Sequence, residues 1–116
     1  MLQTIALGSG RREACALLAG TATSQRICIR HIVAVRNTRR LRHSFGIAAA
    51  DLAALGSGLV GVFHTHATSC TPSSEDFSVF DQCASLRLQV IGALTRGALR
   101  CCAYDRMAQE VAILWH

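Results

Sequence analysis

A short apolar run, Leu59 to Phe63 (Leu-Val-Gly-Val-Phe), leads directly into His64-Thr65-His66. A continuous apolar run of this length is typical of a central strand covered on both faces. Residues two positions apart in a strand point to the same face of the sheet. The two histidines should therefore project together at the carboxyl end of this strand, where open α/β sheets place their sites.

The rest of the chain alternates between short strands and helices. We expect strands at Glu13–Leu18, Arg26–Val35, Leu86–Leu94, Ala98–Tyr104 and Met107–Trp115, with a short strand around Phe45 and Ile47. Helices are predicted at Ala48–Leu55 and from the N-cap Ser73 to about Ala84. The last three strands should form an antiparallel meander. The predicted fold is α/β or α+β: a mixed, largely antiparallel sheet with two main helices, in one domain over residues 1–116.

Composition excludes several classes of protein. With 116 residues, 51% of them hydrophobic, the chain can bury a core without disulfides or a structural metal. No apolar run approaches the roughly 20 residues of a membrane-spanning helix. No secretory signal is visible, so we expect a cytoplasmic protein that does not bind membranes.

Six cysteines are present, and none are spaced as Cys-x-x-Cys. Because no secretion signal is apparent, we do not expect a disulfide framework. Four of them lie in apolar stretches and are interpreted as small buried hydrophobes: Cys15, Cys28, Cys83 and Cys101. Cys70 differs, because it lies in a polar loop close to the histidines.

The net charge of +5 comes from arginine, and the basic residues cluster between Arg26 and His43. Such a cluster can indicate nucleic-acid binding. No aromatic residues interleave with these arginines, however, and stacking on single strands requires them. A solvated face, or a surface for an acidic protein partner, fits the pattern better.

The histidine pair predicts a metal site. Two imidazoles on one strand face can reach a single ion, and zinc is the usual ion for imidazole with carboxylate oxygen. Asp76, one turn into the following helix, is the candidate third ligand. The alternatives are histidines that bind no metal and an aspartate that only compensates the helix dipole.

A hydrolytic zinc site also needs a base and benefits from a donor to the developing oxyanion. Ser73 is the candidate donor, although it also serves as an N-cap. Glu13 is the candidate base, since it is the only acid among the first fifty residues and opens an apolar strand. Pairing with Arg11 or Arg12 explains Glu13 equally well.

The order of these residues resembles the JAMM family of metalloproteases, also called MPN-plus or Mov34/PAD-1, and its small prokaryotic members in particular. The resemblance rests on Glu13 in an early strand, Phe63-His64-Thr65-His66 and Pro72-Ser73-Ser74-Glu75-Asp76, and extends over nearly the whole chain. It implies a core similar to that of cytidine deaminases. It also implies one Zn²⁺ held by His64, His66 and Asp76, with a water as the fourth ligand.

The same resemblance implies a mechanism. Glu13 accepts the proton of that water, the resulting hydroxide attacks a peptide or isopeptide carbonyl, and Ser73 donates a hydrogen bond to the oxyanion. Glu13 then passes its proton to the leaving amine. Bacterial relatives act on small ubiquitin-like sulfur carriers with a Gly-Gly tail, so a protein of that class is the expected substrate and partner.

The loop after the histidines departs from the family pattern. It is one residue shorter than usual between His66 and Ser73, and Ala67 replaces the favoured proline. Ser74 would restore the usual spacing to His66 but shorten the spacing to Asp76, so Ser73 is preferred as the oxyanion donor. In this atypical loop, Cys70 could approach the metal.

Three other functions compete with this interpretation. The first is a domain of the same fold that binds no metal and serves as a scaffold. The second is a nucleobase deaminase, whose His-x-Glu and Pro-Cys-x-x-Cys signature is missing from this sequence. The third is a basic nucleic-acid binder.

Overall fold

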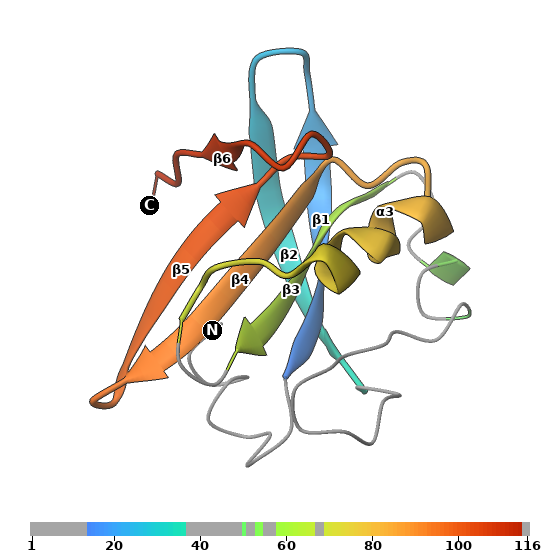
Figure 1. Cartoon of the computed structure of the whole chain (residues 1–116). Helices are drawn as coiled ribbons and strands as arrows, with labels where there is room; N and C mark the ends of the chain where they lie inside the picture. The colour runs from blue at the N-terminus through green and yellow to red at the C-terminus, as the bar shows by residue number, and fades with distance from the viewer. Residues whose placement is uncertain (1–13, 37–49, 51–52, 55–57, 67–68, 115–116) are drawn as a thin grey trace.

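The computed structural model describes residues 14–36, 50, 53–54, 58–66 and 69–114, in which six strands form one mixed sheet (Figure 1). The strands are β1 (Cys15–Ala22), β2 (Ile27–Val35), β3 (Leu59–His66), β4 (Leu88–Thr95), β5 (Ala98–Tyr104) and β6 (Glu110–Val111). Their order across the sheet is β2-β1-β3-β4-β5-β6. Strands β3 and β4 run parallel, whereas the other neighbouring pairs are antiparallel. The predicted mixed, largely antiparallel sheet is confirmed.

Strand β3 lies between β1 and β4 and is buried along almost its full length. Its apolar run fills both faces, which confirms the prediction of a central strand. The strand continues to His66, past the predicted end at Phe63. Because His64 and His66 are still in the strand, the alternation of side chains applies to both of them.

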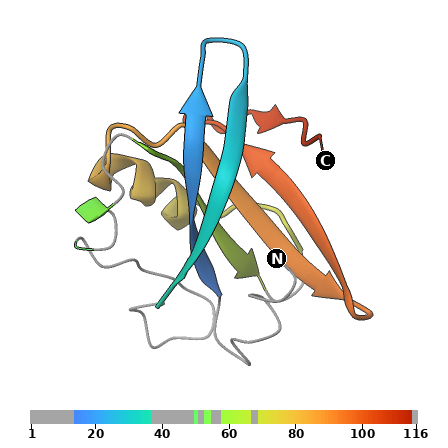
Figure 2. The same cartoon turned by 180° about the vertical axis from the view of Figure 1, so that it is seen from behind.

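A short helical segment covers one face of this sheet. It consists of a 3-10 helix, η2 (Ser74–Ser78), and a single α-helical turn, α3 (Val79–Gln82). The segment lies in front of the sheet in Figure 1 and behind it in Figure 2, which shows the molecule from the other side. Val79 and Phe80 pack there in one apolar cluster with residues of β1, of β3 and of the loop after α3: Cys15, Leu17, Leu59, Val62 and Leu86.

The other face carries a second apolar cluster, as expected for a central strand with two buried sides. The alternating residues Ala16 and Leu18 of β1 point to this side, whereas Cys15 and Leu17 point to the helix. The rest of the second cluster comes from β3, β4 and β5: Val60, Phe63, Leu88, Val90 and Ala103.

The predicted helix from Ser73 to about Ala84 is wrong in type and length. Ser73 is the N-cap, as expected, but the first turn is 3-10 and the helix ends at Gln82. Serine and aspartate in the Ser74–Ser78 segment have low helix propensity, which favours this short form. Of the predicted helix Ala48–Leu55, only Ala50, Ala53 and Ala54 are described, and they are helical. The short strand expected around Phe45 and Ile47 lies outside the described residues.

The predicted strand Met107–Trp115 is also wrong, because β6 spans only Glu110–Val111. A turn occupies the preceding residues: the carboxylate of Asp105 accepts hydrogen bonds from the N–H groups of Met107 and Gln109. Ala108 has φ of 62°, which no strand residue adopts. Residues 112–114 form no strand, and Trp115 lies outside the described residues.

The hairpin between β4 and β5 turns at Arg96 and Gly97, in agreement with the antiparallel arrangement predicted for these strands. Arg96 and Gly97 both have positive φ, 52° and 80°, which matches the twist of a tight hairpin. Within the described ranges, none of the helices combines the length and apolar character needed to cross a bilayer. The cytoplasmic location stays a prediction.

Candidate metal centre

Two histidine side chains meet on the helix-bearing face of β3. His64 and His66 follow Val62, which belongs to the apolar cluster under α3, so all three point the same way. Their Nε2 atoms lie 3.0 Å apart. The side chain of His64 is fully buried, whereas that of His66 is 17% exposed. The pair therefore opens to solvent on the His66 side.

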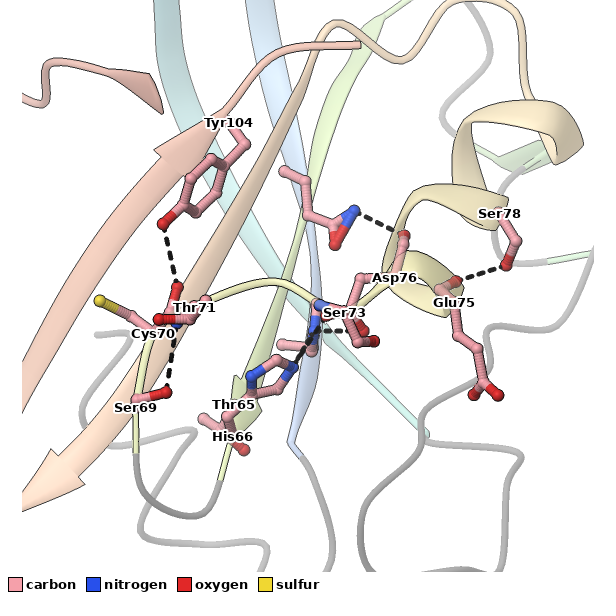
Figure 3. Close-up of polar contacts among 12 residues, drawn as sticks. Thr65, His66, Ser69, Cys70, Thr71, Ser73, Glu75, Asp76, Ser78 and Tyr104 are labelled. Atoms are coloured by element: carbon pink, nitrogen blue, oxygen red, sulfur yellow. Dashed lines mark hydrogen bonds and ion pairs between the residues drawn. The ribbon is translucent and has the colours of Figure 1, made fainter. Parts of the chain in front are cut away.

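Asp76 completes the group from the 3-10 helix above the strand. Its Oδ1 atom lies 3.2 Å from Nε2 of His64, and its Oδ2 atom lies 3.1 Å from Nε2 of His66. Asp76 is N3 of the helix, and its Oδ2 also accepts a hydrogen bond from the N–H of Ser73 at 2.7 Å (Figure 3). The structure thus brings together all three residues that the sequence nominated as ligands.

These three residues fit a zinc ion. Their ligand atoms all lie within 4.8 Å of one another. Tetrahedral zinc with bonds of about 2.0–2.1 Å separates neighbouring ligand atoms by about 3.3–3.4 Å. The Nε2 atoms of His64 and His66, 3.0 Å apart, come close to that spacing, and each lies 3.1 to 3.2 Å from a different carboxylate oxygen of Asp76. Two imidazoles and one carboxylate are also the donor set of many catalytic zinc sites, which keep one position open.

The electrostatics of the group favour a neutral His64 and an ionised Asp76. Burial lowers the pKa of His64, and this outweighs the carboxylate of Asp76, which raises it. Burial alone would raise the pKa of Asp76, but hydrogen bonds from His64, from His66 and from the N–H of Ser73 hold it well below its usual range. Neutral imidazole and ionised carboxylate are the states that coordinate a cation.

Ser73 stands at the entrance of the group. Its backbone is extended (φ −98°, ψ 166°), as an N-cap requires, and its side chain is exposed beside Asp76. Figure 3 shows Ser73 next to Asp76 and His66. Ser74 is also exposed, and it is the first residue of η2. The choice of Ser73 as the oxyanion donor stays a prediction.

Glu13, the predicted base, lies outside the described residues. The neighbouring residue Ala14 is described, and it is hydrogen-bonded to Thr65, the middle residue of the His-Thr-His motif. The N–H of Ala14 donates to Oγ1 of Thr65 at 2.8 Å, and the N–H of Thr65 donates to the carbonyl of Ala14 at 3.1 Å. The role of Thr65 was not predicted from the sequence, although a hydroxyl side chain between two candidate ligands on a buried strand indicates a hydrogen-bonding partner nearby.

The loop between the histidines and the helix is fastened to β5. Cys70 forms a disulfide with Cys102 in this structure, which corrects the expectation that the chain lacks disulfides and that Cys70 could approach the metal. The Tyr104 hydroxyl donates to the carbonyl of Cys70 at 3.2 Å (Figure 3). Cys15 is buried as expected, but Cys28 is exposed, so the interpretation of Cys28 as a buried hydrophobe is wrong.

Comparison with known proteins identifies the family of this chain. The family described as prokaryotic homologues of the JAB domain, Prok-JAB, matches residues 4–105. The chain belongs to the Prok-JAB family. This Prok-JAB chain is thus a prokaryotic homologue of the JAB domain, which confirms the family predicted from the sequence. No curated protein matches it at a significant level.

Solved structures show the same fold. A protein of Desulfitobacterium hafniense, determined in solution, is 22% identical, with a TM-score of 0.77 over 97% of this chain and 84% of its own. A JAB1/MPN domain protein from Archaeoglobus fulgidus is 20% identical, with a TM-score of 0.63 over 97% and 85%. A third structure, described as JAMM, a metalloprotease-like zinc site in the proteasome and signalosome, is 21% identical, with a TM-score of 0.57 over 97% and 84%.

Proposed function

We propose that this Prok-JAB domain is a zinc-dependent peptidase or isopeptidase. The bonds it would hydrolyse are peptide or isopeptide bonds at the C-terminal tail of a small ubiquitin-like, sulfur-carrier type protein. The observation that carries the proposal is the convergence of His64, His66 and Asp76, whose ligand atoms lie within 4.8 Å of one another. The partly exposed side of His66 leaves room for a substrate to approach.

Each residue has a defined role in the proposed reaction. His64, His66 and Asp76 would hold the ion, which, when bound, would polarise the scissile carbonyl and activate a water at neutral pH. Glu13 would accept the proton of the attacking water and deliver it to the leaving amine. The exposed hydroxyl of Ser73 would donate a hydrogen bond to the oxyanion.

The proposed substrate follows from the family resemblance and from the charge of the chain. A Gly-Gly tail has no bulky side chains, so it suits a site that lies between a helix end and a strand. The net charge of +5 favours an acidic partner. Among the described basic residues, Arg26, Arg30 and His31 are exposed on or beside β2, while Arg39, Arg40 and Arg42 lie outside the described part.

Two measurements on the same preparation test the proposal. The first is the zinc content of the purified protein by mass spectrometry, for which we expect one ion per chain that EDTA removes. The second is incubation with the Gly-Gly-tailed proteins of the same cell, followed by intact-mass analysis. Loss of a tail fragment should stop after EDTA treatment and return with added Zn²⁺.

The outcomes separate the competing functions. A protein that binds no zinc would be a scaffold of the same fold. A zinc protein that cleaves none of the tailed substrates would contradict the proposed substrate class. Binding to single-stranded nucleic acid that weakens with salt would support the alternative of a basic nucleic-acid binder.

A further inference from the structure

A single glutamine interrupts the buried side of β4. Gln89 is fully buried, although its neighbours Leu88 and Val90 are apolar core residues on the opposite face. It lies beside Val62 of β3 in the parallel pairing, two residues before His64. Gln89 therefore points to the same face of the sheet as the candidate ligands.

The side-chain amide of Gln89 reaches the helix that carries Asp76. Its Nε2 donates to the backbone carbonyl of Asp76 at 2.7 Å. This hydrogen bond joins η2 directly to the sheet. Since the acceptor is a carbonyl, only the NH₂ end of the amide can face it, which fixes the orientation of the side chain.

The cost of burying Gln89 argues against a role in packing alone. Its Oε1 atom is buried and has no hydrogen-bond partner among the described residues. A methionine or leucine would fill similar space without leaving a polar atom unsatisfied. What glutamine adds at this position is the hydrogen bond to Asp76.

We infer that Gln89 is a positioning residue for the metal ligand Asp76. The inference rests on the proposed function, because it assigns Asp76 as a ligand. A 3-10 helix of one or two turns holds its own residues weakly, so the direction of the Asp76 carboxylate depends on external contacts. Gln89 fixes the backbone of Asp76, and the N–H of Ser73 fixes Oδ2. Groups behind the ligands of a metal site commonly tune its affinity in this way.

Arg106 provides a matched control. Its guanidinium donates to the carbonyls of Phe80, Cys83 and Leu86, so it fastens the end of α3 and the loop after it. These contacts lie beyond Asp76 in the chain. Replacing Arg106 should loosen the same helical segment without releasing the Asp76 carbonyl.

The test compares Gln89→Met, which keeps the length and removes the donor, with Arg106→Met. The first readout uses metal-free protein: hydrogen exchange of the Ser73 amide, expressed relative to the strand amide of Ile91. The second readout is zinc affinity by competition with a chromophoric chelator. We expect Gln89→Met to speed relative Ser73 exchange about tenfold and to weaken zinc binding by about 10- to 100-fold. Arg106→Met should change neither value by more than about twofold.

Each result has a defined meaning. Wild-type behaviour of Gln89→Met in both measurements overturns the inference, as does weaker zinc binding with unchanged Ser73 exchange. If the wild-type protein binds no zinc, the proposed function fails, while Ser73 exchange still decides whether Gln89 positions Asp76. If Gln89→Met does not fold, a measurement on the wild-type protein decides instead. It is the NMR coupling through the hydrogen bond between Gln89 Nε2 and the carbonyl carbon of Asp76. Absence of this coupling overturns the inference.

Discussion

Thr65 holds Ala14 at both of its backbone groups: it donates its N–H to the Ala14 carbonyl and accepts the Ala14 N–H on its side chain. Ala14 is only 3% exposed, so water cannot replace either hydrogen bond. The residue between the two histidines therefore secures the start of β1, where the chain leaves Glu13.

Replacing Thr65 by valine should show how much the side-chain hydrogen bond to Ala14 contributes to stability. Valine has the same shape but leaves the buried N–H of Ala14 without an acceptor, at a cost of about 1–3 kcal/mol in the free energy of unfolding. Thr65→Ser keeps the hydroxyl and should lose much less. Urea denaturation of the metal-free proteins measures both, and equal stability of the two variants would show that the side-chain hydrogen bond contributes nothing.

Asp76→Ala should abolish stoichiometric zinc binding, because it removes the carboxylate that contacts both histidines. We expect zinc affinity to fall by at least about 100-fold, more than for loss of a group behind the ligands. Asp81→Ala is the matched control, since Asp81 is an exposed acid of α3. Metal analysis after gel filtration gives the result, and a zinc-loaded Asp76→Ala protein would remove Asp76 from the ligand set.

Glu13→Gln should separate metal binding from turnover. The amide cannot take a proton, so kcat should fall by about 10²–10⁴-fold while one zinc per chain is retained. Glu75→Gln changes an exposed acid next to Asp76 and should leave kcat unchanged. Undiminished peptidase activity of Glu13→Gln would remove its assignment as the base.

The metal-free protein should lose stability as the pH falls. The pKa of His64 is lowered by burial, so below its ordinary value of 6.5 the unfolded chain takes up a proton that the folded chain does not. The pKa of Asp76 is also lowered, by its hydrogen bonds. The contribution of Asp76 to the free energy of unfolding is therefore lost at lower pH, as the pH falls past the ordinary pKa of 3.8. Both shifts act in the same direction.

Urea denaturation of EDTA-treated protein between about pH 7.5 and about pH 2.5 measures this dependence. Asp76→Asn lacks the titrating carboxyl and should flatten the most acidic part of the curve. A metal-free protein that becomes more stable on acidification would contradict the assigned protonation states.

The cysteines should divide into four reactive and two bonded residues. The disulfide joins Cys70 to Cys102, which leaves the other four cysteines as thiols. Maleimide labelling of the unfolded, air-purified protein should therefore modify four thiols, and six after reduction. Cys101→Ser should keep the disulfide, whereas Cys102→Ser should lose it. Six reactive thiols without reduction would show that the disulfide is not formed in solution.

The sequence predicts the central strand and the meeting of the two histidines because both depend on local alternation. It also predicts Ser73 as the N-cap, which brings Asp76 into the first turn. Contacts between distant segments are not visible in this way. The bond between Cys70 and Cys102 and the reach of Gln89 to Asp76 depend on which strands become neighbours, and no local pattern encodes that.

Similarly, the apolar character of the last residues did not predict how short β6 is. The turn that shortens it is set by the side chain of Asp105, which accepts two backbone hydrogen bonds. A solitary Gln89 in an apolar strand was nevertheless a readable signal, since a buried amide needs a partner.

The fastening of the 69–83 segment to β4, β5 and the turn after β5 has a consequence for synthesis. All three candidate ligands have left the ribosome once residue 76 has emerged, but Gln89, Tyr104 and Arg106 follow later. Strand β4, the parallel neighbour of the histidine strand, is also missing at that stage. A nascent chain therefore carries the ligands before it carries their supports, and a metal-binding geometry should appear only after residue 106 has emerged from the ribosome.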